Sequence, residues 1–102
     1  MQTFVMATRL APGALSSPKN LEELERRAVS AVETTCPDVK WTASYAVSGP
    51  YDYLDVFEAP DVATATRVST LIRTFGHAHT EVWCASAWDD FKAMVRDLPS
   101  AT

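Results

Sequence analysis

Two histidines and a glutamate alternate along one short segment, at His77, His79 and Glu81. Alternate residues of a β-strand point to the same side, so this spacing could present two imidazoles and a carboxylate to a metal ion. The competing interpretation is a set of polar caps or surface groups at the start of a strand, because His77 directly follows Gly76. The spacing permits a metal site and is not diagnostic of one.

Acidic and phenolic side chains gather in the middle of the chain, where Tyr45, Tyr51 and Tyr53 lie close to Asp52 and Asp55. Proton abstraction needs an acceptor and a polarising donor, so one of these aspartates as a base and one tyrosine as a donor would form a catalytic pair. An aspartate beside a turn also accepts backbone amides and fixes a hairpin, and this structural role is favoured for Asp52.

The tryptophans at Trp83 and Trp88 are candidates to line an apolar pocket for a small organic molecule. Packing is the favoured interpretation for both, and Trp88 is expected to anchor a terminal helix against the sheet. The candidate ligand-binding residues are therefore Tyr45, Tyr51, Asp52, Tyr53, Asp55 and Trp83.

Sequence motifs for cofactors are missing: the chain has no glycine-rich phosphate loop, nucleophile elbow or zinc-finger spacing. No cofactor is expected on this basis. Cys36 and Cys84 lie far apart and outside any CxxC motif. They are expected to be buried, reduced thiols, and the sequence leaves their redox state open.

The chain has 102 residues, of which 47% are hydrophobic and 22% charged, which fits one globular domain spanning residues 1–102. Nine basic and 13 acidic side chains give a formal net charge of −4, which argues against nucleic acid or an anionic membrane as a partner. Its apolar runs are far shorter than the roughly 20 residues that cross a bilayer, and no signal-like segment begins the chain. A cytoplasmic location is expected.

Hydrophobic periodicity predicts four strands and three helices. A capping box at Asn20 and Glu23 opens the first helix, Cys36-Pro37-Asp38 ends it, and Gly76 provides a left-handed end for the second. Val39, Trp41, Ala43, Tyr45 and Val47 alternate along residues 39–48 and are expected to lie on one side of that strand. Gly49-Pro50 is expected to make a tight connection within an antiparallel hairpin. The expected order is a strand at 3–10, a helix from 20, strands at 39–48 and 51–58, a helix at 62–75, a strand at 80–87 and a helix at 89–98. The last helix is expected to carry Phe91, Met94, Val95 and Leu98 on one side.

This order is the βαββαβ pattern of an α+β, ferredoxin-like fold with a four-stranded antiparallel sheet, two helices on one face and a short C-terminal helix. The opposite face would be open. Trp41, Tyr45, Tyr53, Phe57 and Trp83 supply more apolar surface than two helices can hide. Two copies pairing sheet to sheet would cover it, because a self-complementary patch closes under two-fold symmetry. The sequence therefore predicts a homodimer.

The motif Gly49-Pro50-Tyr51-Asp52 and the residues after it, Val56, Glu58, Ala59, Pro60 and Asp61, resemble the signature of the GYD domain family. The resemblance extends from the first strand and Ser17-Pro18 through Gly76 and Thr80 to residues 88–91. It implies a dimeric α/β barrel built from two ferredoxin-like subunits, and it implies no settled activity. Cys36-Pro37 and the polar Asp55 depart from the family pattern, and Asp55 would give this chain an unusual cavity.

Three functional hypotheses follow. The first is a non-catalytic homodimeric module that binds another molecule, with a small apolar or aromatic ligand in a cavity between facing sheets. The second is a small cofactor-independent enzyme, of oxygenase or isomerase type, that uses an aspartate and a tyrosine in that cavity. The third is a metal-binding variant through His77, His79 and Glu81.

Overall fold

The computed structural model describes residues 1–14 and 18–100 and confirms the predicted order of elements. Residues 15–17, which include part of the predicted loop and Ser17 of the family resemblance, lie outside the described residues. The elements are β1 (Gln2–Leu10), α1 (Pro18–Thr35), β2 (Lys40–Ala46), β3 (Tyr53–Ala59), α2 (Val62–Thr74), β4 (Ala78–Ala85) and α3 (Trp88–Arg96). None of these three helices has the length and hydropathy that crossing a membrane requires.

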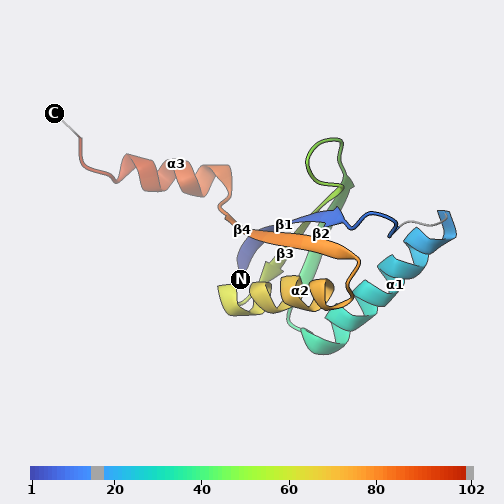
Figure 1. Ribbon diagram of the computed structural model, residues 1–102. Coiled ribbons are helices and arrows are strands. Elements are labelled where there is room, and N and C mark those ends of the chain that lie inside the picture. Colours follow the sequence, from blue (N-terminus) through green and yellow to red (C-terminus); the bar gives the residue numbers. More distant parts are fainter. Residues whose placement is uncertain (15–17, 101–102) are drawn as a thin grey trace.

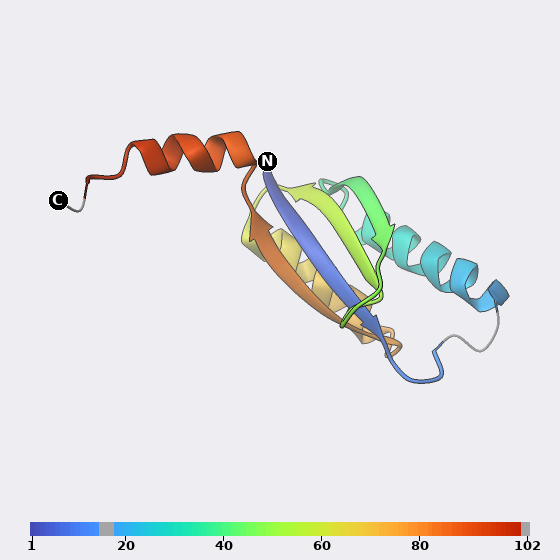
Figure 2. The same ribbon diagram turned by 90° about the horizontal axis from the view of Figure 1, so that it is seen from above.

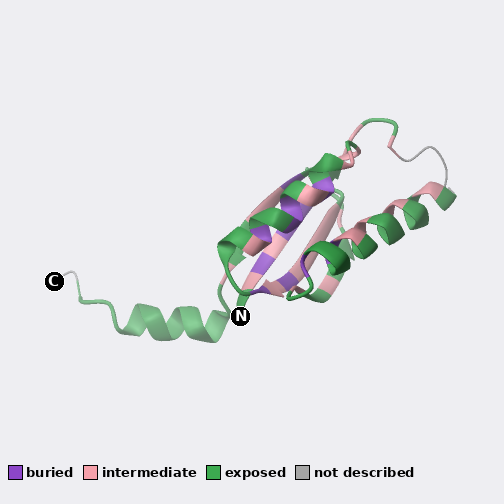
Figure 3. Cartoon of the chain, turned by 90° about the horizontal axis from the view of Figure 1, so that it is seen from below, coloured by how far each residue is buried: buried purple, intermediate pink, exposed green. Residues whose placement is uncertain are grey.

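The four strands form one antiparallel sheet in the order β2-β3-β1-β4. Helices α1 and α2 lie on the same side of this sheet, and its other side is uncovered (Figures 1 and 2). The buried side chains concentrate between the central strands and α2 (Figure 3). Phe4 on β1 stacks on Phe57 on β3, with ring centroids 5.7 Å apart, and Val68 of α2 is fully buried against them in the same core.

Helix α2 has the local signals that the sequence predicts for it. Asp61 at its N-cap accepts a hydrogen bond from the Thr64 amide at 2.8 Å, which satisfies one free amide of the first turn. After the C-cap at Phe75, Gly76 adopts a left-handed backbone with φ of +79°, a conformation that strains other residues. Ser69 and Thr80 then join α2 to β4 through a buried hydrogen bond of 2.6 Å.

Helix α1 begins earlier than predicted, at Pro18. Asn20 therefore lies inside the first turn, and its side-chain Nδ2 donates to the carbonyl of Ala14 at 2.5 Å. The predicted capping box at Asn20 and Glu23 is wrong, because proline is itself suited to the first position of a helix and moves the start upstream.

A β-bulge between Trp41 and Ala43 changes which side of the sheet each residue of β2 faces, compared with the prediction. Trp41 lies opposite Phe57, whereas Ala43 lies opposite Val56, so one extra residue reverses the alternation along the strand. Trp41 therefore faces the helices and stacks on Phe57 at 5.3 Å. Tyr45, which follows the bulge, lies on the open side, and the prediction that both share one side is wrong.

The connection between β2 and β3 is longer than the predicted tight turn. Strand β2 ends at Ala46, and β3 begins at Tyr53. Tyr51 and Asp52 therefore belong to a loop rather than to the predicted strand at 51–58. This loop is closed by a backbone hydrogen bond of 3.0 Å from the Val47 amide to the Asp52 carbonyl. The antiparallel pairing of β2 with β3 agrees with the prediction.

Two packing predictions at the end of the chain are wrong. Helix α3 has no buried residue and projects away from the sheet, so Trp88 does not anchor it there. Trp88 is 68% exposed and stacks on Phe91 of the same helix, with centroids 5.4 Å apart. Cys36 is buried as predicted, whereas Cys84 is exposed because it lies near the end of the edge strand β4. Both thiols are free.

Candidate functional site

The open side of the sheet has an apolar centre and a polar, aromatic margin. Residues directly opposite each other in an antiparallel pair share a side, and the register therefore identifies the residues that face away from α1 and α2. They are Thr3, Val5, Ala7 and Arg9 on β1, Leu54, Val56 and Glu58 on β3, Lys40, Ala43 and Tyr45 on β2, and His79, Glu81, Trp83 and Ala85 on β4. Tyr45 is 59% exposed and Trp83 is 41% exposed.

Tyr51 joins this side of the sheet from the loop between β2 and β3. Its hydroxyl donates a hydrogen bond to Glu81 Oε2, and its ring meets Trp83 edge to face, with centroids 5.9 Å apart. The Arg9 guanidinium lies over the same ring at 5.4 Å, within the range of a cation–π interaction. Arg9, Tyr51, Glu81 and Trp83, which we call the open-face cluster, thus come from β1, the loop and β4.

Asp52 holds the loop in the position that places Tyr51 on the sheet. Its Oδ2 accepts a hydrogen bond from the Leu10 amide at 2.8 Å, and its own amide donates to the Thr8 carbonyl at 2.8 Å. The predicted role of Asp52 as an acceptor of backbone amides is therefore observed. The amide that donates to Asp52, that of Leu10, lies at the end of β1 rather than within the hairpin between β2 and β3.

The hydrogen bond to Glu81 raises the pKa of Tyr51, and partial desolvation and the charge of Glu81 act in the same direction. Arg9 has the opposite and smaller effect on this pKa. Tyr51 therefore stays protonated at neutral pH and donates to the carboxylate. Three of the four residues of the open-face cluster, Trp83, Tyr51 and Arg9, are of the types that dominate binding energy in protein interfaces.

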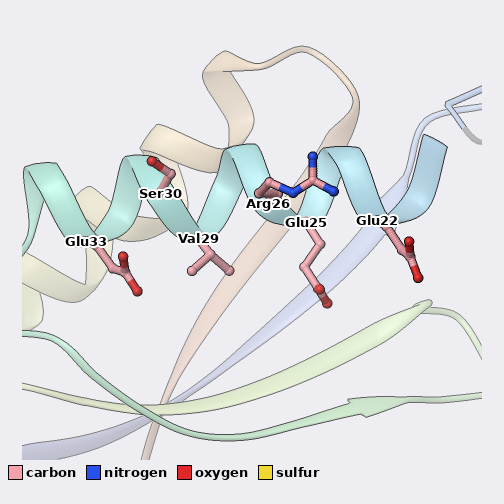
Figure 4. A pocket seen from close by; sticks show the side chains of 6 residues that line it. All are labelled: Glu22, Glu25, Arg26, Val29, Ser30 and Glu33. Carbon is pink, nitrogen blue, oxygen red and sulfur yellow. The ribbon is translucent and has the colours of Figure 1, made fainter. Parts of the chain in front are cut away.

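The other two candidate residues, Tyr53 and Asp55, lie on the helix side of the sheet, opposite Thr8 and Met6 of β1. Here α1 stands away from the strands and leaves a cleft of about 560 Å³. The cleft is lined mainly by apolar residues, together with the acidic side chains Glu25, Glu33 and Asp55 and no lysine or arginine. Figure 4 shows Glu25, Val29 and Glu33 directed from α1 toward the strands.

Asp55 is a half-buried acidic group in the lining of this cleft. Burial raises its pKa, hydrogen bonds with Ser44 and Trp41 act against the rise, and the charge of Glu25 adds to it. Trp41 Nε1 also donates to Ser44 Oγ at 2.9 Å. Burial likewise raises the pKa of Tyr53, with smaller contributions from Asp52 and Glu25. Asp55 and Tyr53 thus share a cleft under α1, separated by the sheet from Tyr51.

The structure does not bring the predicted metal ligands together. His77 precedes β4 and stacks on Phe75 at 5.9 Å, and burial followed by the nearby Arg27 lowers its pKa. It lines the cleft under α1. His79 and Glu81 lie on the open side, where Glu81 accepts from Tyr51. Within the described residues, no group of three or more His, Cys, Asp or Glu side chains is placed to hold a metal ion.

Sequence reasoning missed Arg9 of the open-face cluster and the contacts of Asp55 with Ser44 and Trp41. Arg9 is the charged residue of an otherwise uncharged strand, and that isolation was the available signal. Ser44 and Trp41 share a side only because the bulge lies between them, and no simple alternation of residues predicts this.

The chain is similar in sequence and in fold to known proteins. A family model described as the GYD domain matches residues 4–95. A Thermus thermophilus protein named glutamine synthetase and cystathionine beta-lyase binding protein is 35% identical over 81 residues, which cover 78% of this chain and 83% of that protein. A crystal structure of FFRP-DM1 superposes with a TM-score of 0.56 at 22% identity, covering 84% of this chain and all of that one.

The last likeness supports the ferredoxin-like α+β fold, and the match to the family model spans the strands, the loop with Tyr51 and Asp52, and most of α3. Together with the motif Gly49-Pro50-Tyr51-Asp52, it shows that this chain belongs to the GYD domain family.

Proposed function

We propose that this chain is a non-catalytic module that forms a homodimer through the open side of its sheet and binds other proteins. The observation that carries the proposal is the open-face cluster, in which Arg9, Tyr51, Glu81 and Trp83 contact one another on a surface that none of the described helices covers. Large exposed apolar surface with a polar margin is typical of a protein interface.

Self-pairing suits the composition of this face. Its centre is apolar, at Val5, Leu54 and Val56, and its margin carries both a cation, Arg9, and an anion, Glu81. A surface with both signs of charge can meet its own copy without net repulsion, and two-fold pairing makes each contact twice.

A protein partner is supported by the relative that is named for binding glutamine synthetase and cystathionine beta-lyase. The arrangement of the candidate acids gives less support to the enzyme hypothesis in its original form. Asp52 is engaged with the backbone of β1, and Asp55 lies on the other side of the sheet from Tyr51. An aspartate and tyrosine pair in a cavity between facing sheets therefore has no support from these contacts.

The test compares self-association of the full chain with that of Trp83→Ser, using sedimentation velocity over a range of concentrations. Val62→Ser is the matched control, because Val62 is an exposed apolar residue at the start of α2 on the helix side. We expect Trp83→Ser to weaken the dimer at least tenfold and Val62→Ser to leave it unchanged. Equal association of the two variants would overturn the proposed interface.

Binding of other proteins is tested by isothermal titration of the wild-type chain with purified glutamine synthetase and cystathionine β-lyase from the same organism. Saturable binding to either enzyme, at a fixed ratio of chains, is the expected result. Titrations without binding to both enzymes, at concentrations where the chain is a dimer, would contradict a role like that of the named relative.

The cleft under α1 supports a second candidate function, the binding of a small molecule. Its volume of about 560 Å³ and its mainly apolar lining with a few polar groups, among them Asp55, are typical of ligand sites. Asp55 would accept from a donor group, such as an amine, on an apolar molecule. A thermal-shift screen of apolar amines and matched neutral alcohols should show stabilisation of the wild type by the amines and its loss in Asp55→Asn.

A further inference from the structure

Helix α3 carries an apolar side none of whose residues is buried by the rest of the described chain. The residues on it, Trp88, Phe91, Met94, Val95 and the following Leu98, are all at least 41% exposed. Asp89, Asp90, Lys92 and Arg96 supply the polar side. A helix with such separated sides is stabilised in proteins by packing its apolar side against another surface.

Local signals alone do not account for this helix. It has nine residues, and its N-cap is Ala87, which makes no side-chain capping hydrogen bond. An isolated helix of this length is only marginally stable in water, since even good helix formers need about 12–15 residues. Its acidic first turn and Arg96 in the last turn add only fractions of a kcal/mol each. Helix α3 therefore needs a surface to pack on.

The position of α3 indicates where that surface lies. Two residues, Ser86 and Ala87, join it to β4. In Figure 1 the helix projects past the end of the sheet and rises to the side opposite α1 and α2, as does the loop that carries Tyr51. Both segments thus border the space in front of the open face, where the second copy of the proposed dimer would lie.

The area of the open face gives a second reason to place α3 on a second copy. Strands of seven to nine residues, about 3.3 Å per residue and about 4.8 Å apart, give a face of about 500 Å². A stable interface buries about 800 Å² on each partner. A nine-residue helix presents about 140 Å², so the two arms of a dimer would add about 300 Å² to each copy's share.

We propose that α3 is an arm that packs its apolar side, through Trp88, Phe91 and Val95, on the second copy at the end of the paired sheets. This inference rests on the proposed homodimer. Each copy contributes one arm and receives one, so the contact is made twice under two-fold symmetry.

The test uses two full-length double variants and measures dimer dissociation constants by sedimentation equilibrium. Trp88→Ser with Phe91→Ser removes the apolar side, and Asp90→Ser with Lys92→Ser alters the polar side by the same number of serines. Because α3 buries nothing in its own chain, both should keep the wild-type circular dichroism and unfolding transition of the dissociated chain. We expect at least a tenfold larger dissociation constant for the apolar pair alone.

The alternatives give different results. A wild-type dimer whose dissociation constant is the same in both variants would overturn the arm and leave the proposed dimer standing. A wild type that remains monomeric at every concentration would overturn both. A loss of stability in the apolar pair that does not depend on concentration would show that α3 packs on its own chain, which also overturns the arm.

Discussion

Tyr51 and Asp52 are neighbours in the family motif and do different things. Asp52 binds the backbone of β1, and Tyr51 reaches across to Arg9, Glu81 and Trp83. The aspartate fixes the loop, and the fixed loop presents the tyrosine. In this chain the position of the Tyr51 ring therefore depends on the backbone contacts of Asp52.

The contribution of Asp52 can be measured directly. Replacing it by alanine removes the acceptor for the Leu10 amide, and we expect a loss of about 1 kcal/mol in the free energy of unfolding. Asp52→Asn keeps an acceptor oxygen and should recover most of that loss. Urea denaturation of the three proteins gives the comparison, and equal loss in both variants would show that charge, not hydrogen bonding, is what matters at this position.

Asp55 gives a prediction for pH. Its pKa is raised in the folded chain, so the folded state binds more protons than the unfolded state just above the ordinary value of 3.8. Stability should therefore fall as pH rises through the interval between the unfolded and the folded pKa. Asp55→Asn should remove this component, so its stability relative to wild type should rise from pH 3 to pH 7.

Urea midpoints at several pH values test this, with Asp52→Asn as a control that lies outside the cleft. A constant difference between wild type and Asp55→Asn from pH 3 to pH 7 would contradict a buried, proton-binding carboxyl at this position.

At the scale of elements, the order of strands and helices was predictable because each has a clear apolar period. The side of the sheet that each residue of β2 faces was not predictable. The sequence alternates without interruption through Trp41, Ala43 and Tyr45, and the bulge that separates them is set by pairing with β3. The five large aromatic residues expected on the open face therefore lie on both sides of the sheet. Only Tyr45 and Trp83 lie on the open side.

The two helices on the sheet should contribute unequally to stability. Ile72 of α2 is buried in the core, whereas Leu24 of α1 is partly exposed and lines the cleft. We expect Ile72→Ala to cost about 2–5 kcal/mol, the usual range for such a core residue, and Leu24→Ala to cost clearly less. Thermal or urea unfolding of this matched pair would contradict the open cleft if the two losses were equal.

The periodicity of the sequence predicts helix α3 but not the surface on which it packs. The spacing of Phe91, Met94, Val95 and Leu98 predicted a helix with one apolar side, and that helix is present. Spacing shows which side is apolar but carries no information about what covers it. For this reason the prediction that Trp88 packs against the sheet of its own chain was wrong.

At the scale of the whole molecule, α1 and α2 cover one side of the sheet, the other side is uncovered by any described helix, and α3 projects past the end of the sheet. The fold follows from the order of elements and from the family motif, both of which are readable in one sequence. Assembly depends on how two surfaces match, and one chain's residue pattern specifies only one of them. Pairing of two chains is therefore tested by a direct measurement of mass.

Sedimentation equilibrium of the full-length wild type, from nanomolar to high micromolar concentration, is the most direct test. We predict a mass that rises from the 11.2 kDa of one chain at high dilution to twice that value, with no larger species. A mass of 11.2 kDa at every concentration would contradict pairing through the open face. The open-face cluster would then bind a different protein rather than a second copy of this chain.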